Sequence, residues 1–421
     1  MATTSVSVAE ICLAAKRASR RLATLSSAVR DAALEAIADA LLAATEEILD
    51  ANARDLQAGA AAGLSDALMD RLALTEDRIA QMAAGVRTIA ALPDPVGEVI
   101  DGKTLANGLA LRRVRVPLGV IAVVYEARPN VTIDAAALCL KSGNAVVLRG
   151  SSSALHSNSV LAAIASRAAA DAGLPVGALS LIDGGDRDEL AQLATQSGVV
   201  DLIIPRGGEG LKAALKGVAT VPVIFAASGN NHVFVDADAD LDAALEILLN
   251  AKLQRPGTCN AAEKLLVHAD LAERFVPRAL DALHRAGVRL HGDDRVRELA
   301  GSIPVDAATD EDWDTEYLAL ELAAAVVDCT GDAIEHINRH GSGHSEAIVT
   351  GSTASARAFG LGVDAACVYV NASTRFTDGG EFGMGAEIGN STQKLHARGP
   401  IGLRELCTFK YLVDGDGQVR G

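Results

Sequence analysis

The sequence has no excess of basic residues. Its 421 residues contain 38 Lys and Arg against 54 Asp and Glu, which gives a formal net charge of −16. A chain this acidic has no general attraction for nucleic acid or for an anionic membrane surface. We therefore expect neither as a partner, and an anionic ligand must bind at a local cluster of positive charge.

Long apolar runs and an export signal are also missing. Hydrophobic residues make up 49% of the chain, but Pro222 interrupts the longest charge-free stretch, residues 217–235. That stretch does not suit a membrane-spanning helix. Glu10 stands where a signal peptide would carry its apolar segment. We therefore expect a soluble protein of the cytoplasm.

Closely paired cysteines are absent as well. Without a CxxC motif, the cysteines suit free thiols in a reducing compartment rather than a disulfide framework or a zinc knuckle. The six cysteines are Cys12, Cys139, Cys259, Cys329, Cys367 and Cys407.

What the chain does contain is enough length for two or three domains. Residues 6–92 are rich in alanine and carry apolar residues at helical spacing, which predicts helices. Residues 99–100 and 109–116 predict two strands joined by a turn at Asn107 and Gly108. We expect this hairpin, which is basic on one face, to lie at a subunit edge.

From residue 119 onward, short apolar runs alternate with helical stretches such as residues 153–172. This alternation predicts an α/β protein with two doubly wound domains, each a parallel sheet with crossover helices. We expect the last strand, residues 408–413, to pair with the hairpin. The other strands are expected at 121–125, 145–149, 179–182, 200–205 and 221–225, and then at 232–235, 263–268, 324–328, 346–350 and 367–371.

Cys259 stands in a context that suits a nucleophile. Pro256 and Gly257 predict a tight turn after a helix over residues 241–253. A thiol on such a turn can face a ligand, and nearby backbone N–H groups or Arg255 can lower its pKa from about 8.5. A buried structural cysteine is the alternative, and residue type alone favours it.

Three histidines, His336, His340 and His344, fall four residues apart, which on one unbroken helix would suit zinc. Glycines at 341 and 343 break that helix, and no HExxH motif accompanies the histidines. We therefore expect no metal, and expect His340 and His344 to meet a substrate anion at the mouth of the site. A histidine-ligated zinc hydrolase is the alternative from another class of enzyme.

Four motifs carry a resemblance to a known family. In chain order they are YEARPNVT (125–132), LKSGNAVVLRGSSSA (140–154), ASGNNHVFVDADADLD (227–242) and GTCN (257–260). This order resembles the aldehyde dehydrogenase superfamily over most of the chain. The resemblance implies the fold of that superfamily, two doubly wound α/β domains with a small β flap for oligomerisation.

Two longer strings narrow the resemblance. VDCTGDAIEHINRHGSGHSEAI (327–348) and RFTDGGEFGMGAEIGNSTQKLHARGP (375–400) resemble the branch of the superfamily that reduces L-glutamyl 5-phosphate. What this implies is NADPH-dependent reduction of that substrate to L-glutamate 5-semialdehyde, through a cysteine thioester, in proline biosynthesis. It also implies a homo-oligomer and allows glutamate 5-kinase as a partner.

The same resemblance implies a division into domains. Residues 1–235 would form the cofactor-binding domain, with 93–118 contributing to the oligomerisation flap. Residues 236–366 would form the catalytic domain. Residues 367–421 would return to the cofactor domain and add the oligomerisation strand.

The resemblance also implies roles for single residues. Cys259 matches the nucleophile, and Asn130 matches the amide that forms the oxyanion hole with the Cys259 backbone N–H. Arg149 and Ser152 stand where relatives carry a lysine and a glutamate, and an arginine with a serine suits the 2′-phosphate of NADPH. Further cofactor contacts are expected from Ser151, Gly207, Gly208 and Glu316, and further substrate contacts from Arg375 for an anion and Glu387 for the ammonium group.

One expected residue is missing. Hydrolytic aldehyde dehydrogenases carry a glutamate that activates water, and it would align with Phe225, Ala226 or Ala227. Residues 221–235 contain neither Asp nor Glu, so hydrolysis of a thioester would lack its general base. We expect phosphate, rather than water, to exchange with the acyl group. A hydrolytic aldehyde dehydrogenase and a non-catalytic binding relative are the remaining alternatives.

Overall fold

The computed structural model describes residues 6–184, 186–225 and 228–420. The chain divides into two compact units. The first unit comprises residues 1–225, 384–389 and 401–421, and the second comprises residues 226–383 and 390–400. None of the helices in the described residues combines the length and the apolar content that crossing a bilayer needs.

The first unit opens with helices, as residues 6–92 predict. Ser7 caps the first of them in a capping box with Glu10, whose side chain accepts from the Ser7 backbone N–H at 2.9 Å. Such reciprocal capping fixes where a helix begins. The five helices are α1 (Val8–Leu22), α2 (Ser27–Ala43), α3 (Thr45–Ala61), α4 (Asp66–Leu72) and α5 (Glu76–Ala91).

A four-stranded parallel sheet follows, in the order β5-β4-β3-β6. The run expected at 221–225 is not a strand, and Val223 forms only an isolated bridge with Ile203. Pro222 has no N–H to donate, which breaks a ladder there. The strands are β3 (Val120–Tyr125), β4 (Ala145–Arg149), β5 (Leu179–Leu181) and β6 (Leu202–Arg206), and the helices that follow them are α6 (Asn130–Lys141), α7 (Leu155–Asp171), α8 (Arg187–Ala194) and α9 (Glu209–Val218).

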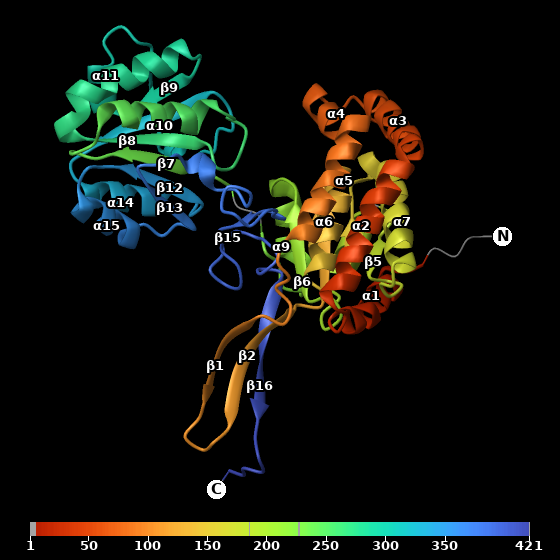
Figure 1. Ribbon diagram of the computed structural model, residues 1–421. Coiled ribbons are helices and arrows are strands. Elements are labelled where there is room, and N and C mark those ends of the chain that lie inside the picture. The colour runs from red at the N-terminus through yellow and green to blue at the C-terminus, as the bar shows by residue number, and fades with distance from the viewer. Residues whose placement is uncertain (1–5, 185, 226–227, 421) are drawn as a thin grey trace. The chain divides into compact units, whose positions relative to one another are not determined.

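A separate antiparallel sheet projects from the first unit as an arm (Figure 1). It consists of β1 (Val99–Thr104), β2 (Ala110–Pro117) and β16 (Cys407–Asp414), with β2 in the centre. Gly108 makes the expected turn between β1 and β2 with a φ of +85°. The predicted pairing of the last strand with the hairpin is confirmed, because β16 runs antiparallel to β2 along its length.

The second unit contains a seven-stranded parallel sheet with helices on both faces. Alternation along β7 shows why: Val233 and Val235 pack in the apolar cluster that includes residues of α10 and α11, whereas Phe234 packs in the cluster that includes residues of α14 and α15. A strand buried on both faces is mostly apolar, as residues 233–235 are. The polar residues that begin β7, Asn231 and His232, are buried with hydrogen-bond partners. The sheet order is β10-β9-β11-β8-β7-β12-β13.

The strands of this sheet are β7 (Asn231–Val235), β8 (Ala262–His268), β9 (Arg289–Gly292), β10 (Asp306–Ala307), β11 (Glu321–Val327), β12 (Ser345–Val349) and β13 (Cys367–Val370). The helices are α10 (Leu241–Leu253), α11 (Ala269–Arg285), α12 (Asp294–Leu299), α13 (Asp310–Asp314), α14 (Thr330–His340) and α15 (Thr353–Gly362). A small antiparallel pair, β14 (Asn390–Ser391) and β15 (Gly399–Pro400), completes the unit.

The boundary between the units differs from the expected one. We expected the first domain to extend to residue 235 and the chain to return to it at residue 367. Instead, β7 is hydrogen-bonded between β8 and β12, and β13 pairs with β12 at the edge of the same sheet. A strand belongs to the unit whose ladder satisfies its backbone groups. The second unit therefore begins at residue 226 instead of 236, and it includes residues up to 383 and 390–400 instead of ending at 366.

Candidate active site

In the first unit, Asn130 and the expected cofactor residues lie at the carboxyl ends of neighbouring strands. Asn130 follows β3, Arg149 ends β4, and Gly207 and Gly208 follow β6. The carboxyl ends of parallel strands meet at one edge of a sheet, where open α/β sheets bind ligands. Residues far apart in the sequence are thus brought to one edge of the first unit.

Asn130 is the first residue of α6 and is exposed. Its Nδ2 donates to Asp134 Oδ2 at 3.0 Å, one turn further along the helix. Burial raises the pKa of Asp134 to about 6, while the hydrogen bond from Asn130 and the charge of Arg206 act in the opposite direction. A side-chain amide has two N–H groups, and this bond uses one of them. The other remains for a ligand oxygen.

Arg149 is turned inward, with 8% of its surface exposed. Its Nη2 donates to the backbone oxygen of Asp186 at 2.6 Å, and among the described residues its Nε has no hydrogen-bond partner. Burial lowers the pKa of Arg149, and the carboxylates of Glu189 and Asp186 oppose that shift. The guanidinium stays charged at neutral pH, so it offers a cation with an unused donor.

A small pocket lies beside Arg149 in the same unit. Gly150, Ser151, Asn158 and Asp183 are among the residues that line it. Ser151 caps the short 3₁₀ helix η1 (Ser152–Ala154), and its hydroxyl lies 2.7 Å from that of Ser153. The Ser151 hydroxyl can bond a ribose or phosphate oxygen, and the expected cofactor contacts of Ser151 and Ser152 stay predictions.

Gly207 and Gly208 form the turn into α9, as expected. A Cβ on Gly207 would lie 2.7 Å from the carboxyl carbon of Glu126 and 2.8 Å from Leu211 Cδ2, so a larger residue would displace the ends of these two side chains. Gly208 precedes the helix, and its N–H donates to Glu126 Oε2 at 3.2 Å. The N-terminus of a helix attracts anions, and here a carboxylate of the chain itself takes that place.

In the second unit, Cys259 lies in the turn between α10 and β8 and is half-buried. The helix over 241–253 that precedes this turn is confirmed as α10. The Cys259 backbone oxygen accepts from Asn231 Nδ2 at 2.8 Å. A Cβ on Gly229 would come within 1.5 Å of that same oxygen. The turn is therefore held against the residues that enter β7.

Glu316 reaches the same place. Its Oε1 accepts from the Gly229 backbone N–H at 2.6 Å. Gly229 packs directly against the Cys259 backbone. The Glu316 carboxylate is therefore attached to the same stretch of backbone that holds the Cys259 turn. This is consistent with the expectation that Glu316 binds a ligand next to the nucleophile.

Arg375 supplies positive charge beside Cys259. It lies in the 3₁₀ helix η2 (Thr374–Phe376), where its Nη1 donates to Thr258 Oγ1 at 3.0 Å and its Nε to Gln254 Oε1 at 2.9 Å. Burial lowers the pKa of Arg375, as does Arg255, whereas Cys259 raises it. The attraction is mutual, so the guanidinium favours the thiolate.

The three histidines do not converge. His340 bonds Asp314 through Nδ1 at 2.8 Å, and its ring lies 4.7 Å from that of His336. His344 is 1% exposed and bonds Ser345 Oγ at 2.7 Å, and burial lowers its pKa to about 4. His340 can meet a substrate anion, but His344, against expectation, has almost no surface to offer one because it fills the interior at the start of β12.

The remaining candidates divide between the units. Glu387 lies in the short 384–389 segment of the first unit, whereas Arg375 belongs to the second. Asn130 and Cys259 likewise belong to different units, so their joint oxyanion hole stays a prediction. Among the described residues, no group of three or more His, Cys, Asp or Glu side chains has an arrangement that could hold a metal ion.

Cys259 differs from the other cysteines in its surroundings. Cys12, Cys139, Cys367 and Cys407 are buried, and Cys329 is exposed. Burial raises the pKa of Cys12 to about 11 and that of Cys407 to about 12, which keeps these thiols protonated and unreactive. The half-buried thiol beside a guanidinium is Cys259.

The residues that hold the Cys259 turn were not predicted from the sequence. Asn231 bridges the turn to β12, since its Nδ2 bonds the oxygens of Cys259 and Ala261 and its Oδ1 accepts from the Ser345 N–H. Its neighbour Asn230 donates to the His340 backbone oxygen at 2.7 Å. The signal in the sequence was the polar run SGNNH inside an apolar region.

Comparison with known proteins identifies the family. Residues 1–297 match the model of the aldehyde dehydrogenase family. The chain therefore belongs to the aldehyde dehydrogenase family, and the fold class expected from its motifs is confirmed.

Relatives that match almost the full chain are more specific. The chain is 56% identical over 413 residues to the gamma-glutamyl phosphate reductase of Thermobifida fusca, covering 98% of each chain. It is 57% identical over 407 residues to that of Moorella thermoacetica, covering 96% of this chain and 97% of the relative. The crystal structure of gamma-glutamyl phosphate reductase from Thermotoga maritima superposes with a TM-score of 0.97 at 45% identity, covering 99% of this chain and 100% of the other. Within its family, the chain belongs with the gamma-glutamyl phosphate reductases.

Proposed function

We propose that the chain reduces L-glutamyl 5-phosphate to L-glutamate 5-semialdehyde and phosphate with NADPH, as a step of proline biosynthesis, and that Cys259 carries the acyl group. The observation that carries this proposal is the 56% identity to a gamma-glutamyl phosphate reductase over 98% of the chain. The position of Cys259 beside Arg375 supports the chemistry, because a thiolate is the reactive form of a cysteine.

The residues of the second unit account for the covalent step. The Cys259 thiolate attacks the acyl carbon and phosphate leaves, which forms a thioester. Bound NADPH would supply the hydride that reduces the thioester. The resulting thiohemiacetal then releases the aldehyde and restores the thiol. Arg375 favours the thiolate and offers a donor to an anionic group of the substrate.

The residues of the first unit fit a nicotinamide dinucleotide. The hydroxyls of Ser151 and Ser152 would donate to ribose or phosphate oxygens. A phosphate at the N-terminus of α9, after Gly207 and Gly208, would replace the Glu126 carboxylate at the Gly208 N–H. The Nε of Arg149 lacks a partner among the described residues, and a 2′-phosphate beside it would supply one. We therefore propose NADPH as the preferred cofactor and Glu316 as a ligand of the nicotinamide ribose.

The substrate also carries an ammonium group and a carboxylate. We propose Arg375 and His340 for the anionic groups and Glu387 for the ammonium. His344 is left out because it is 1% exposed. Cooperation with glutamate 5-kinase, which would supply the acyl phosphate, is a further prediction that co-sedimentation of the two purified enzymes tests.

The arm of the first unit supports a proposal about assembly. Phe409, Tyr411 and Val413 alternate along β16 and are 45%, 56% and 51% exposed, and alternate residues of a strand share a face. We propose that a second copy of the chain covers this face in a homo-oligomer. Light scattering tests this with Tyr411→Glu, which we expect to dissociate the oligomer, with Lys410→Glu on the opposite face as the control.

The direct test of the activity is the reverse reaction. Purified protein with L-glutamate 5-semialdehyde, NADP⁺ and phosphate should form NADPH at a rate that saturates with the semialdehyde. No turnover under these conditions, with turnover of unrelated aldehydes in the absence of phosphate, would contradict the proposal and favour a hydrolytic aldehyde dehydrogenase. For that alternative the expected glutamate is absent, because positions 225, 226 and 227 are Phe, Ala and Ala. Positions 226 and 227 lie outside the described residues.

A further inference from the structure

The second unit buries three charged side chains next to one another, close in sequence to the Cys259 turn. Lys252, Glu263 and Lys264 are each 0% exposed. Lys252 Nζ donates to Glu263 Oε2 at 3.1 Å. Burial lowers the pKa of Lys264 to about 8 and raises that of Glu263 to about 7. Ion pairs this deeply buried seldom stabilise a fold more than apolar side chains would, so a role besides stability is expected for them.

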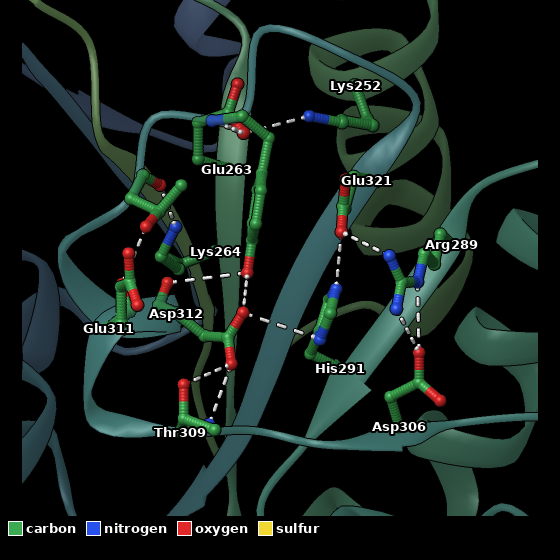
Figure 2. Close-up of polar contacts among 12 residues, drawn as sticks. Lys252, Glu263, Lys264, Arg289, His291, Asp306, Thr309, Glu311, Asp312 and Glu321 are labelled. Atoms are coloured by element: carbon green, nitrogen blue, oxygen red, sulfur yellow. Dashed lines mark hydrogen bonds and ion pairs between the residues drawn. The ribbon is translucent and has the colours of Figure 1, made fainter.

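Glu263 and Lys264 both bind the backbone of one short segment. Lys264 Nζ donates to the Thr315 backbone oxygen at 2.7 Å. The Tyr317 backbone N–H donates to Glu263 Oε2 at 3.2 Å. Figure 2 shows Glu263 and Lys264 within this network of polar contacts. The backbone is therefore held on each side of the residue between these two, Glu316.

The side chain of Tyr317 adds further anchors. Its hydroxyl donates to Asp312 Oδ1 at 2.8 Å, and its ring lies 4.6 Å from Lys264 Nζ in a cation–π contact. The ring of His291 stacks on the ring of Tyr317 at 5.5 Å. His291 in turn bonds Glu321 through Nε2 at 2.7 Å (Figure 2). Residues 315–317 are thus fixed by both backbone and side chain.

The next residue shows that the segment is held in an unfavourable conformation. Leu318 has a φ of +53°, a region that residues with side chains rarely adopt. Its side chain is 46% exposed, so burial of that side chain does not account for the conformation. Such a backbone persists only where its surroundings fix it, and the bonds to Glu263 and Lys264 do so.

The result of this hold is the position of one carboxylate. Glu316 Oε1 accepts from the Gly229 N–H at 2.6 Å, and Gly229 abuts the Cys259 backbone. If the bonds to the Thr315 and Tyr317 backbone were lost, the segment could move and the Glu316 carboxylate would leave the Gly229 N–H.

We infer that Glu263 and Lys264 are positioning residues that grip the backbone on both sides of Glu316 and aim its carboxylate beside Cys259. The inference rests on the proposed function, in which Glu316 binds the nicotinamide ribose. It explains why charge is buried at this position of β8, where apolar side chains would pack without cost. It assigns these two residues to cofactor binding although neither has a surface that a cofactor can touch.

The test compares Lys264→Met with Glu316→Gln in the full-length enzyme. NADPH affinity is measured by fluorescence titration. Glu316→Gln should weaken NADPH about tenfold, the loss of a charge-assisted hydrogen bond, and Lys264→Met should weaken it about three- to tenfold. The double variant should bind no worse than Glu316→Gln alone, because residues that act through one another are not additive. Arg289→Met, in the exposed part of the same network on β9, is the matched control and should bind normally.

A second readout does not depend on the cofactor. Trp313 is the only tryptophan in the chain, and it lies three residues before Glu316. Acrylamide quenching of its fluorescence therefore reports on the segment directly. Quenching should increase in Lys264→Met and stay at the wild-type level in Glu316→Gln and Arg289→Met.

The outcomes separate the inference from the proposed function. If Lys264→Met changes neither quenching nor NADPH affinity, the positioning role is wrong. If quenching increases in Lys264→Met but Glu316→Gln binds NADPH normally, Lys264 does fix the segment and the ribose role of Glu316 is wrong. Should Lys264→Met fail to fold, the paired replacement Lys252→Met with Glu263→Leu removes the bond to Tyr317 together with both members of the Lys252–Glu263 pair. Lys264 then keeps its bond to the Thr315 backbone oxygen. The paired replacement should raise quenching and weaken NADPH about threefold, and normal values for both would overturn the inference.

Discussion

The two units place their functional groups at opposite ends of parallel strands. In the first unit the candidates follow the carboxyl ends of β3, β4 and β6, where α6, η1 and α9 begin. In the second unit Cys259 precedes β8, at the amino end, where α10 has just ended, and Glu316 precedes β11. One edge therefore presents helix N-termini and the other presents helix C-termini.

This difference has an electrostatic consequence. Helix N-termini carry partial positive charge and suit the phosphates of a dinucleotide, whereas helix C-termini carry partial negative charge and disfavour a thiolate. The backbone can thus serve the first site but not the second. Side chains must provide the positive charge near Cys259, which explains the position of Arg375 beside the turn.

The largest effect is expected at the nucleophile. Cys259→Ala should abolish turnover, with a loss of at least about a thousandfold as for other covalent nucleophiles, while folding and cofactor binding in the first unit are retained. Cys329→Ala, at an exposed position of the same unit, is the matched control and should keep full activity. Steady-state rates of both variants check this, and a Cys259→Ala enzyme with more than a thousandth of the wild-type rate would refute the assignment.

Next in size is the effect of omitting phosphate from the reverse reaction. Residues 221–235 offer no carboxylate to activate water, a contribution of about a hundred- to ten-thousandfold when present. Semialdehyde oxidation should therefore require phosphate or arsenate. NADPH formation is followed with and without each anion, with chloride at equal ionic strength as the control. Comparable rates without phosphate would mean that water reaches the acyl group by another route.

A smaller, selective effect is expected in the first unit. Arg149→Glu should weaken NADPH by about a hundredfold and NADH only a few-fold, because it sets a like charge against the 2′-phosphate. Arg149→Gln removes the charge but keeps a polar side chain of similar shape. Its loss of NADPH affinity should be smaller than that of Arg149→Glu but larger than the loss of NADH affinity. KM values for both cofactors measure this. Equal losses for the two would show that Arg149 holds the Asp186 loop rather than the cofactor.

The smallest effect tests whether a side chain, Arg375, supplies the positive charge that the backbone does not supply near Cys259. Arg375→Met should slow alkylation of Cys259 by iodoacetamide about three- to tenfold at neutral pH, because loss of the cation raises the thiol pKa. Arg278→Met, an exposed arginine on α11 paired with Asp242, should alkylate at the wild-type rate. Unchanged alkylation of Arg375→Met would mean that another group stabilises the thiolate.

Local patterns in the sequence sufficed for much of the architecture. The strand runs 145–149 and 367–371, the helix 241–253 and the arm formed with residues 408–413 could be predicted because period, turn residues and apolar content are local properties. The strand predicted at 221–225 was wrong for a reason that is also local, because Pro222 cannot donate a backbone hydrogen bond to a ladder. The expected turn after the helix 241–253 was confirmed, and Cys259 is half-buried in it; its role as nucleophile stays a prediction.

Long-range contacts were beyond the reach of the pattern. His344 looked available in the sequence because a glycine-rich loop precedes it, yet the structure buries it against Ser345. Asn231 lies just before the strand expected at 232–235 and had no predicted role, yet it ties the Cys259 turn to β12. Whether a polar side chain faces solvent or satisfies a buried backbone group depends on neighbours from distant segments.

The sequence by itself determined the two α/β units, the candidate nucleophile and the family, because hydrophobic period and motif strings are written in consecutive residues. Only the tertiary structure decided which unit owns β7 and β13, that Arg375 lies at the Cys259 turn, and that Glu263 and Lys264 grip the segment around Glu316. The physical reason is that burial and charge pairing are properties of contacts between residues that lie some 50 to 120 positions apart in the chain, and strand order in the sheet creates those contacts.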